Sequence, residues 1–220
     1  MKMKCDFSYN HYSETIELAL SKGYKFYPIR EAELALTGEK SAVMRHDVDH
    51  QLELALNMAE VEATLGISTT YFLRVHAKGY SPLSLKSTKI MKKIQELGHE
   101  IGFHYEGSYA SVHGLSHKDC FKADLEILRY SSGAEIVSVS PHEPTREGGY
   151  HIPEDWMSEN NLKFQAYDGI FMNKMKYISD SSCNWREGCM HNFFASATQD
   201  KLCVLTHPFW WFSDSVLENY

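Results

Sequence analysis

The chain has 220 residues, of which 43% are hydrophobic and 23% charged, and this composition is ordinary for a globular protein with one sizeable core. Its net charge of -7 argues against nucleic acid as a partner, because no basic stripe is present to neutralise phosphates. No apolar run is long enough to span a bilayer, and the first residues lack the apolar stretch of a signal peptide.

Cysteine usage and chain organisation set two further expectations. The five cysteines are odd in number and contain no Cys-x-x-Cys pair, which favours reduced thiols over a disulfide framework. We therefore expect a soluble cytoplasmic protein. No Pro/Gly-rich linker or internal repeat divides the chain, so we expect a single domain over residues 1–220. The oligomeric state stays open.

Predicted strands and helices alternate along most of the chain. The helices carry apolar residues at helical spacing and stop at glycines. The expected elements, in chain order, are strand 41–44, helix 50–65, strand 67–73, a helix with Ile90, Met91, Ile94 and Leu97, strand 100–104, a helix from Ser116 to Gly133, strand 136–140, a loop over 143–153, and strands at 164–167 and 202–206. This alternation is typical of right-handed βαβ units around a parallel sheet.

Ionisable side chains stand at the ends of four of these strands. Because the carboxyl ends of parallel strands meet at one edge of a sheet, we expect these side chains to form one site. They are Asp47 and Asp49 after the first strand, His104 and Glu106 after strand 100–104, His142 after strand 136–140, and His207 after the last strand.

The chemistry of this set favours a metal site. Asp49 and His104 are residue types that bind Zn²⁺ or another divalent cation, and a catalytic site keeps one position open for water. Asp47, two residues from Asp49, is placed to act as general base, and His207 is the candidate acid. The ordinary alternatives are a helix N-cap for Asp49, a carboxylate that orients a histidine for Asp47, and a buried imidazole for His207.

Four motifs in this order resemble the polysaccharide deacetylase superfamily, carbohydrate esterase family four (CE4). They are Arg-His-Asp-Val-Asp at 45–49, Thr-Thr-Tyr-Phe-Leu at 69–73, Leu-Gly-His-Glu-Ile-Gly-Phe-His at 97–104 and Leu-Thr-His-Pro at 205–208. The first is similar to the Asp-Val-Asp subset, which includes deformylase-type enzymes that act on lipid-linked amino sugars. The resemblance implies an α/β fold, a distorted (β/α) barrel with fewer than eight strands.

The same resemblance implies a function and most of a site. A divalent metal, zinc in most members, would drive hydrolysis of an N-acyl group, acetyl or formyl, from an amino sugar in a glycan or glycan precursor. By the family's pattern Asp47 is the base, Asp49 and His104 are metal ligands, and His207 is the catalytic acid.

One ligand and one arginine depart from the family's pattern. The family's second motif carries another histidine four residues after the first, where this chain has Ser108. We expect His142 to be the third ligand, because it follows a strand where the family's third motif lies. Glu106 and His113 are the other candidates. The family's third motif also supplies an arginine that orders the base, a role open here to Arg45 or Arg146.

Other functions and other readings stay open. Ser108 favours a catalytically inactive glycan- or metal-binding descendant of the same fold. A metal phosphoesterase is a weaker alternative, because that class opens with a His-x-His that this chain lacks. The aromatic run at 209–212 would line a glycan groove, close the barrel or form a subunit contact. Residues 177–186 would form a substrate wall, with an Asp180–Arg186 ion pair as the structural alternative.

Overall fold

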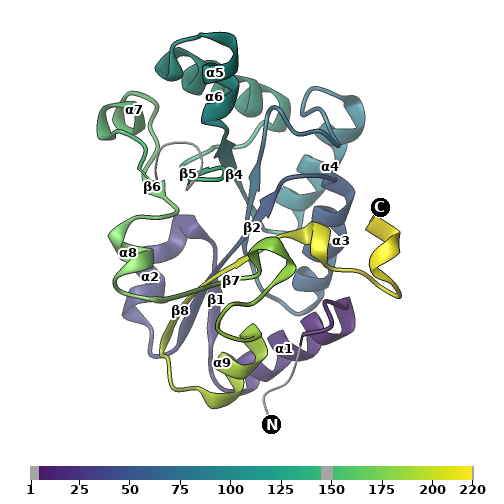
Figure 1. Cartoon of the computed structure of the whole chain (residues 1–220). Coiled ribbons are helices and arrows are strands. Elements are labelled where there is room, and N and C mark those ends of the chain that lie inside the picture. Colours follow the sequence, from purple (N-terminus) through teal and green to yellow (C-terminus); the bar gives the residue numbers. More distant parts are fainter. Residues whose placement is uncertain (1–4, 145–150, 220) are drawn as a thin grey trace.

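The computed structural model describes residues 5–144 and 151–219, and its helices lie around one curled sheet (Figure 1). The strands are β1 (Lys25–Tyr27), β2 (Ser41–Val48), β3 (Thr70–Leu73), β4 (Glu100–Tyr105), β5 (Ser138–Pro141), β6 (Phe164–Gln165), β7 (Lys176–Ser179) and β8 (Lys201–Thr206). The α-helices are α1 (Tyr9–Ser21), α2 (Ala32–Thr37), α3 (Leu52–Thr64), α4 (Leu85–Glu96), α5 (Gly107–His113), α6 (His117–Ser132), α7 (Glu154–Glu159), α8 (Gly169–Met172) and α9 (Met190–Ser196). Short 3₁₀ turns are η1 (Ile29–Glu31), η2 (Ser181–Cys183), η3 (Pro208–Trp210) and η4 (Val216–Asn219).

All strand pairs in the sheet are parallel. Seven strands follow one path in the order β6-β5-β4-β3-β2-β8-β7, and β1 pairs with the first half of β2. The path curls but does not close, since β6 and β7 are its two ends. The expected incomplete α/β barrel is confirmed.

Strand β2 lies between β3 and β8 and is buried along its whole length. Its residues alternate between the two faces of the sheet, as a strand requires. Val43 belongs to the apolar cluster inside the half-barrel together with Phe72 and Cys203, whereas Ala42 and Met44 pack against the N-terminal helix. Asp47 therefore stands on the inner face, where it lines the pocket described below.

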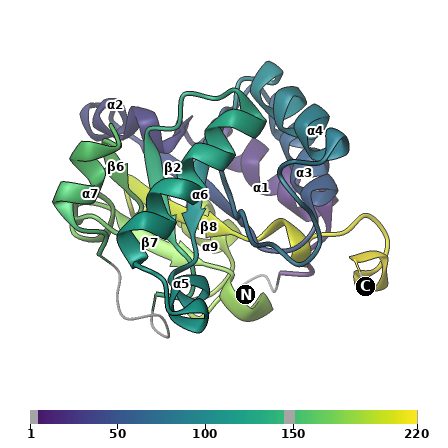
Figure 2. The same ribbon diagram turned by 90° about the horizontal axis from the view of Figure 1, so that it is seen from above.

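Helices α1, α3, α4, α6 and α9 cover the outer face of the sheet (Figure 2), whereas α2 and α8 pack against the inner cluster. One core cluster joins β3, β4 and β5 to the apolar stripes of α3, α4 and α6. A second joins β2 and β8 to α1 and α9. Burial of these apolar stripes is the main favourable contribution to the free energy of folding, and it holds the helices against the sheet. No helix in the described segments is long and apolar enough to cross a membrane.

The expected elements are found with shifted boundaries. Ser116 caps α6, its hydroxyl accepting from the backbone N–H of Asp119 over 3.3 Å, and Gly133 ends the helix in the left-handed conformation. Strand β3 begins at Thr70 rather than at residue 67, because the backbone N–H of Ile67 still closes the end of α3 by donating to the carbonyl of Glu62. The expected loop at 143–153 lies partly outside the described residues.

Candidate functional site

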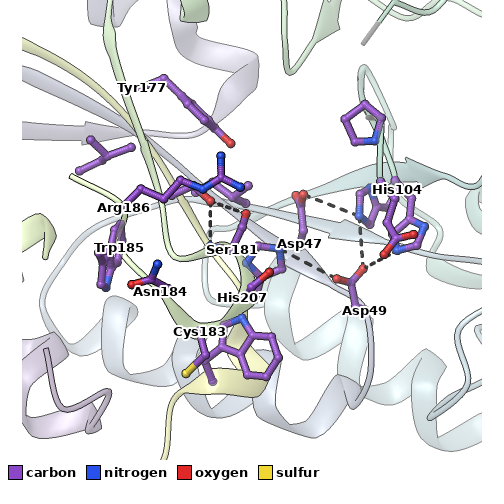
Figure 3. A pocket seen from close by; sticks show the side chains of 18 of the residues that line it. Asp47, Asp49, His104, Tyr177, Ser181, Cys183, Asn184, Trp185, Arg186 and His207 are labelled. Carbon is purple, nitrogen blue, oxygen red and sulfur yellow. Dashed lines mark hydrogen bonds and ion pairs between the residues drawn. The ribbon is translucent and has the colours of Figure 1, made fainter. Parts of the chain in front are cut away.

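The expected site residues meet at the carboxyl edge of the sheet. They line one pocket of about 1060 Å³. Asp47 belongs to β2 and Asp49 follows it, His104 belongs to β4, His142 follows β5, and His207 follows β8. Figure 3 shows Asp49 between His104 and His207, while Tyr177, Trp185 and Arg186 stand on the other side of the pocket.

Asp49 is the centre of the polar cluster. Its Oδ1 lies 3.4 Å from Nε2 of His104 and 3.6 Å from Nε2 of His142, and its Oδ2 lies 4.0 Å from Nε2 of His207. Among the described residues Oδ1 has no hydrogen-bond partner of good geometry, although it is buried. A buried carboxylate oxygen that faces two imidazole nitrogens is costly unless a cation relieves it.

The backbone fixes the orientation of His104. Its Nδ1 lies 2.8 Å from the carbonyl oxygen of Ser140 in β5, so Nδ1 carries the proton and donates. Nε2 is then the atom that faces Asp49 and, at 3.7 Å, Oδ2 of Asp47. A histidine whose second nitrogen is held by a carbonyl is the usual arrangement of a metal ligand.

The pKa values of the residues in this cluster shift in different directions. Burial opposes protonation of His104, but the carboxylates of Asp47 and Asp49 outweigh it and raise its pKa. Burial and the neighbouring His104 lower the pKa of His142. Burial would raise the pKa of Asp49, yet His104, His207 and His142 together lower it. Asp49 is thus ionised at neutral pH, and its field attracts a positive charge to this point.

Arg45 lies beneath Asp47 inside the half-barrel. It is fully buried, its Nη1 donates to Ser140 Oγ over 2.7 Å, and the same nitrogen lies 3.7 Å from Asp47 Oδ1. The guanidinium also stands over the ring of Tyr167, 4.5 Å from its centroid. Arg45 is therefore the arginine placed beside Asp47, while Arg146 lies outside the described residues.

His207 is oriented by a residue that sequence reasoning assigned differently. Asp180, which follows β7 and is fully buried, accepts from His207 Nδ1 over 2.6 Å. Burial opposes protonation, but Asp180 outweighs it and raises the pKa of His207 to about 9. The structural alternative, an Asp180–Arg186 ion pair, is wrong, because the carboxylate oxygens of Asp180 bond to His207 and Trp211.

The two other candidate ligands lie in different surroundings. Glu106 forms a close ion pair with Arg74, and Arg74 Nη1 also lies 3.8 Å from Asp49 Oδ1. His113 is exposed on α5, against Tyr109, and does not line the pocket. Ser108 donates to Glu106 over 3.3 Å. Of the three candidates, His142 is the one whose imidazole faces Asp49.

The donor set suits a divalent cation in kind. One carboxylate and two imidazoles, with a further carboxylate nearby, match zinc and similar borderline ions. The ligand atoms of Asp49, His104 and His142 do not all lie within 4.8 Å of one another. In the part of the chain that the structure describes, a different group meets that distance, formed by Cys5, His11 and Cys189. Asp49 Oδ1 nevertheless lies within 3.6 Å of both imidazole nitrogens, so the residues fit a metal.

The aromatic run at 209–212 divides between two roles. Trp211 is fully buried and packs edge-on against Phe7 and Tyr12. Trp210 is partly exposed and lines the pocket, as do Tyr177 and Trp185 from the facing segment. One tryptophan thus serves the core and the other the pocket.

Comparison with known proteins yields similarity at the level of structure. No protein-family model and no curated protein matches the chain. Among solved structures, a CE4 esterase of Streptococcus mutans has a TM-score of 0.53 at 12% identity, over 86% of this chain and 82% of that one. The peptidoglycan deacetylase PdaC of Bacillus subtilis has a TM-score of 0.50 at 16% identity, over 78% and 76%.

The chain has the fold of the CE4 deacetylases. A mutant of a CE4 family pseudoenzyme from Bacillus anthracis, described as having restored activity, also matches, with a TM-score of 0.50 at 14% identity. The match covers 78% of this chain and 57% of that one. The CE4 fold therefore occurs in enzymes and in a pseudoenzyme, and the site must decide between them.

Proposed function

We propose that the protein is a metal-dependent hydrolase that removes an N-acyl group, acetyl or formyl, from an amino sugar in a glycan or glycan precursor. The observation that carries this proposal is the position of Asp49, whose buried carboxylate faces the imidazoles of His104 and His142. Asp47 and His207 flank it from different strands, as an acid and a base on two sides of a substrate must.

Asp49, His104 and His142 would hold the metal, with zinc as the first choice for a carboxylate and two imidazoles. When bound, such an ion polarises the acyl carbonyl and lowers the pKa of a water molecule towards neutrality. The protein's own contribution is orientation. Ser140 fixes the His104 tautomer through its carbonyl and holds Arg45 through its hydroxyl.

Asp47 and His207 supply the proton transfers in this proposal. Asp47, which lies beside the guanidinium of Arg45, takes a proton from the attacking water. His207 donates its Nδ1 proton to Asp180, so the proton on Nε2 points into the pocket. With its pKa raised to about 9, His207 is protonated at neutral pH and can protonate the departing amine.

The pocket wall supports a sugar as the substrate. Tyr177, Trp185 and Trp210 present aromatic surface beside polar groups, a combination that binds the apolar and hydroxyl faces of a pyranose ring. All five cysteines are free. Free thiols fit the reducing cytoplasm, where the substrate would be a glycan precursor rather than a finished polymer.

The test combines metal content with hydrolysis. Chain purified without chelator is analysed for bound metal and incubated with N-acetylated and N-formylated amino sugars, and the released acetate or formate is measured. We expect hydrolysis that Asp49→Ala abolishes together with about one bound ion per chain. His113→Ala, which changes an exposed histidine outside the pocket, is the matched control. No hydrolysis after addition of Zn²⁺, Co²⁺ or Mn²⁺, with the same metal content in Asp49→Ala as in the wild type, would indicate the inactive glycan-binding alternative.

A further inference from the structure

A second cluster of metal-binding residue types lies away from the pocket's carboxylates. It consists of Cys5 in the N-terminal segment, His11 in the first turn of α1 and Cys189 immediately before α9. One ligand atom from each lies within 4.8 Å of the other two, and His11 Nε2 is 3.2 Å from Cys189 Sγ. Two thiols and one imidazole from such distant parts of the sequence converge on one point.

The three side chains are held in place by their surroundings. His11 and Cys189 are only 5% and 3% exposed, and Cys5 is half-buried. The backbone N–H of His11 donates to Ser8 Oγ over 3.0 Å, and its carbonyl accepts from Thr15 Oγ1 over 2.7 Å. Its ring stacks on His191, with centroids 5.5 Å apart. Little ordering is needed for these groups to bind an ion.

We propose that Cys5, His11 and Cys189 form a second metal site that binds zinc or a similar thiophilic divalent ion. Sulfur and imidazole ligands select such ions, whereas the carboxylate and imidazoles of the pocket are less selective. Each thiol releases its proton to solvent when its sulfur binds the ion. Three protein ligands leave one tetrahedral position, which solvent reaches on the half-exposed side of Cys5.

The bound ion would link the N-terminal segment to the start of α9. The N-terminal segment and α1 pack against α9 on the outer face of β2 and β8 (Figure 1). Phe7 from the same segment contacts Trp211, whose indole N–H donates to the Asp180 carboxylate that orients His207. An ion at this point therefore stabilises the segment that supports the catalytic acid of the proposed function, without touching the pocket's donor set.

Cobalt spectroscopy separates this site from the pocket. Chelator-treated, fully reduced chain is titrated with Co²⁺, because only a site that contains thiolates gives a sulfur-to-cobalt charge-transfer band. We expect the band in the wild type and in Asp49→Ala, which removes only the pocket's ligand. Cys5→Ser and Cys189→Ser should lose it, and Cys120→Ser, a change on the surface of α6, should keep it.

Thermal unfolding gives a second measure. Zn²⁺ should raise the Tm of Asp49→Ala and of the double variant Asp49→Ala/Cys120→Ser, but not of Asp49→Ala/Cys189→Ser.

Absence of the charge-transfer band in reduced wild type, or its persistence in Cys5→Ser and Cys189→Ser, would overturn the proposal. So would a Cys5–Cys189 disulfide in protein purified without reductant, if the reduced protein then bound no ion. Failure of the pocket to bind metal would leave the sulfur-to-cobalt band unchanged, so the two proposals fail separately.

Discussion

Asp180 and His207 form a hydrogen-bonded pair that spans the neighbouring strands β7 and β8, with 2.6 Å between Oδ1 and Nδ1. The other carboxylate oxygen accepts from the backbone N–H of His207 over 3.1 Å and from Trp211 Nε1 over 3.0 Å. The carboxylate is therefore fixed by three donors, and it fixes the imidazole in turn. This arrangement is the reason why Nε2 of His207 faces the pocket.

Replacement of Asp180 tests whether this pair orients the catalytic acid. Asp180→Asn keeps the shape but removes the charge that stabilises protonated His207. We expect kcat to fall by about 10²- to 10⁴-fold while KM and bound metal stay unchanged, as when a histidine loses its orienting carboxylate. Steady-state kinetics with metal analysis measures this split. A kcat within a factor of about three of the wild type would exclude His207 as an acid oriented by Asp180.

Asp47 is predicted to act on the proton rather than on the metal. Its Oδ2 lies 3.7 Å from His104 Nε2, and Arg45 lies on its other side. Asp47→Asn should retain bound metal and lose about 10²- to 10⁴-fold in kcat, because an amide cannot accept the proton. The same measurements on Asp49→Ala should show loss of activity and of the ion at the pocket, both measured in a Cys189→Ser background that removes the proposed thiolate site. A fully active Asp47→Asn enzyme would contradict the base assignment.

The third ligand is tested by comparing two positions. His142→Ala should weaken zinc binding at the pocket by at least about tenfold, because its Nε2 is 3.6 Å from Asp49 Oδ1. Glu106→Gln should weaken it less, because Glu106 is paired with Arg74. Competition with a chelating dye gives the affinities, in a Cys189→Ser background that removes the proposed thiolate site. Stronger loss in Glu106→Gln would make Glu106 the ligand.

The polar residues at the strand ends could be predicted from the sequence, because they are recognised by the residues next to them in the chain. A buried run followed by polar residues indicated where β2, β4, β5 and β8 end, and the parallel topology then brings these ends together. Helices α3, α4 and α6 were predictable for the same reason, since each has a regular apolar stripe and a glycine after it.

The residues that were missed depend on contacts between distant segments. The sequence offered Arg186, six positions away, as one possible partner of Asp180, but Asp180 bonds across the sheet to His207 instead. Strand β7, only four residues long, has no alternating pattern to indicate it. Helix α1 did have a signal, since Ser8 caps it and Tyr12, Thr15, Ile16 and Ala19 form its buried side. Cys5, His11 and Cys189 meet only because α1 and α9 lie on the same face.

The two tryptophans of η3 and its flank should respond differently to truncation. Trp210→Ala should raise KM for a sugar substrate about 3- to 10-fold with little change in Tm, because Trp210 lines the pocket. Trp211→Ala should destabilise the fold by about 3–5 kcal/mol, because its indole is fully buried. Urea unfolding and substrate kinetics on both variants distinguish the roles. Equal effects of the two substitutions on KM would contradict the assignment of Trp210 to the pocket and Trp211 to the core.

A buried network around Glu62 supports both flanks of the site from the outer face of β2. Glu62 Oε1 accepts from Tyr12 over 2.5 Å and lies 2.9 Å from His46 Nε2, while Oε2 accepts from Tyr71 over 2.6 Å. His46 Nδ1 in turn lies 2.6 Å from Thr206 Oγ1. His46 precedes Asp47 and Thr206 precedes His207, so the network holds the backbone of both residues.

This network predicts an acid-labile part of the folding free energy. Burial would raise the pKa of Glu62, but His46 and the other partners outweigh it and lower the pKa from 4.5 to about 2. As the pH falls, Glu62 is therefore protonated in the unfolded chain before it is protonated in the folded chain. The stabilisation that is present above pH 4.5 is lost as the pH falls towards 2. Glu62→Gln should cost about 3 kcal/mol at pH 7, and the difference from wild type should shrink below pH 4.5. Urea unfolding across pH measures it, with exposed Glu60→Gln as control; a difference that stays constant from pH 7 to pH 3 would show that Glu62 is not held ionised.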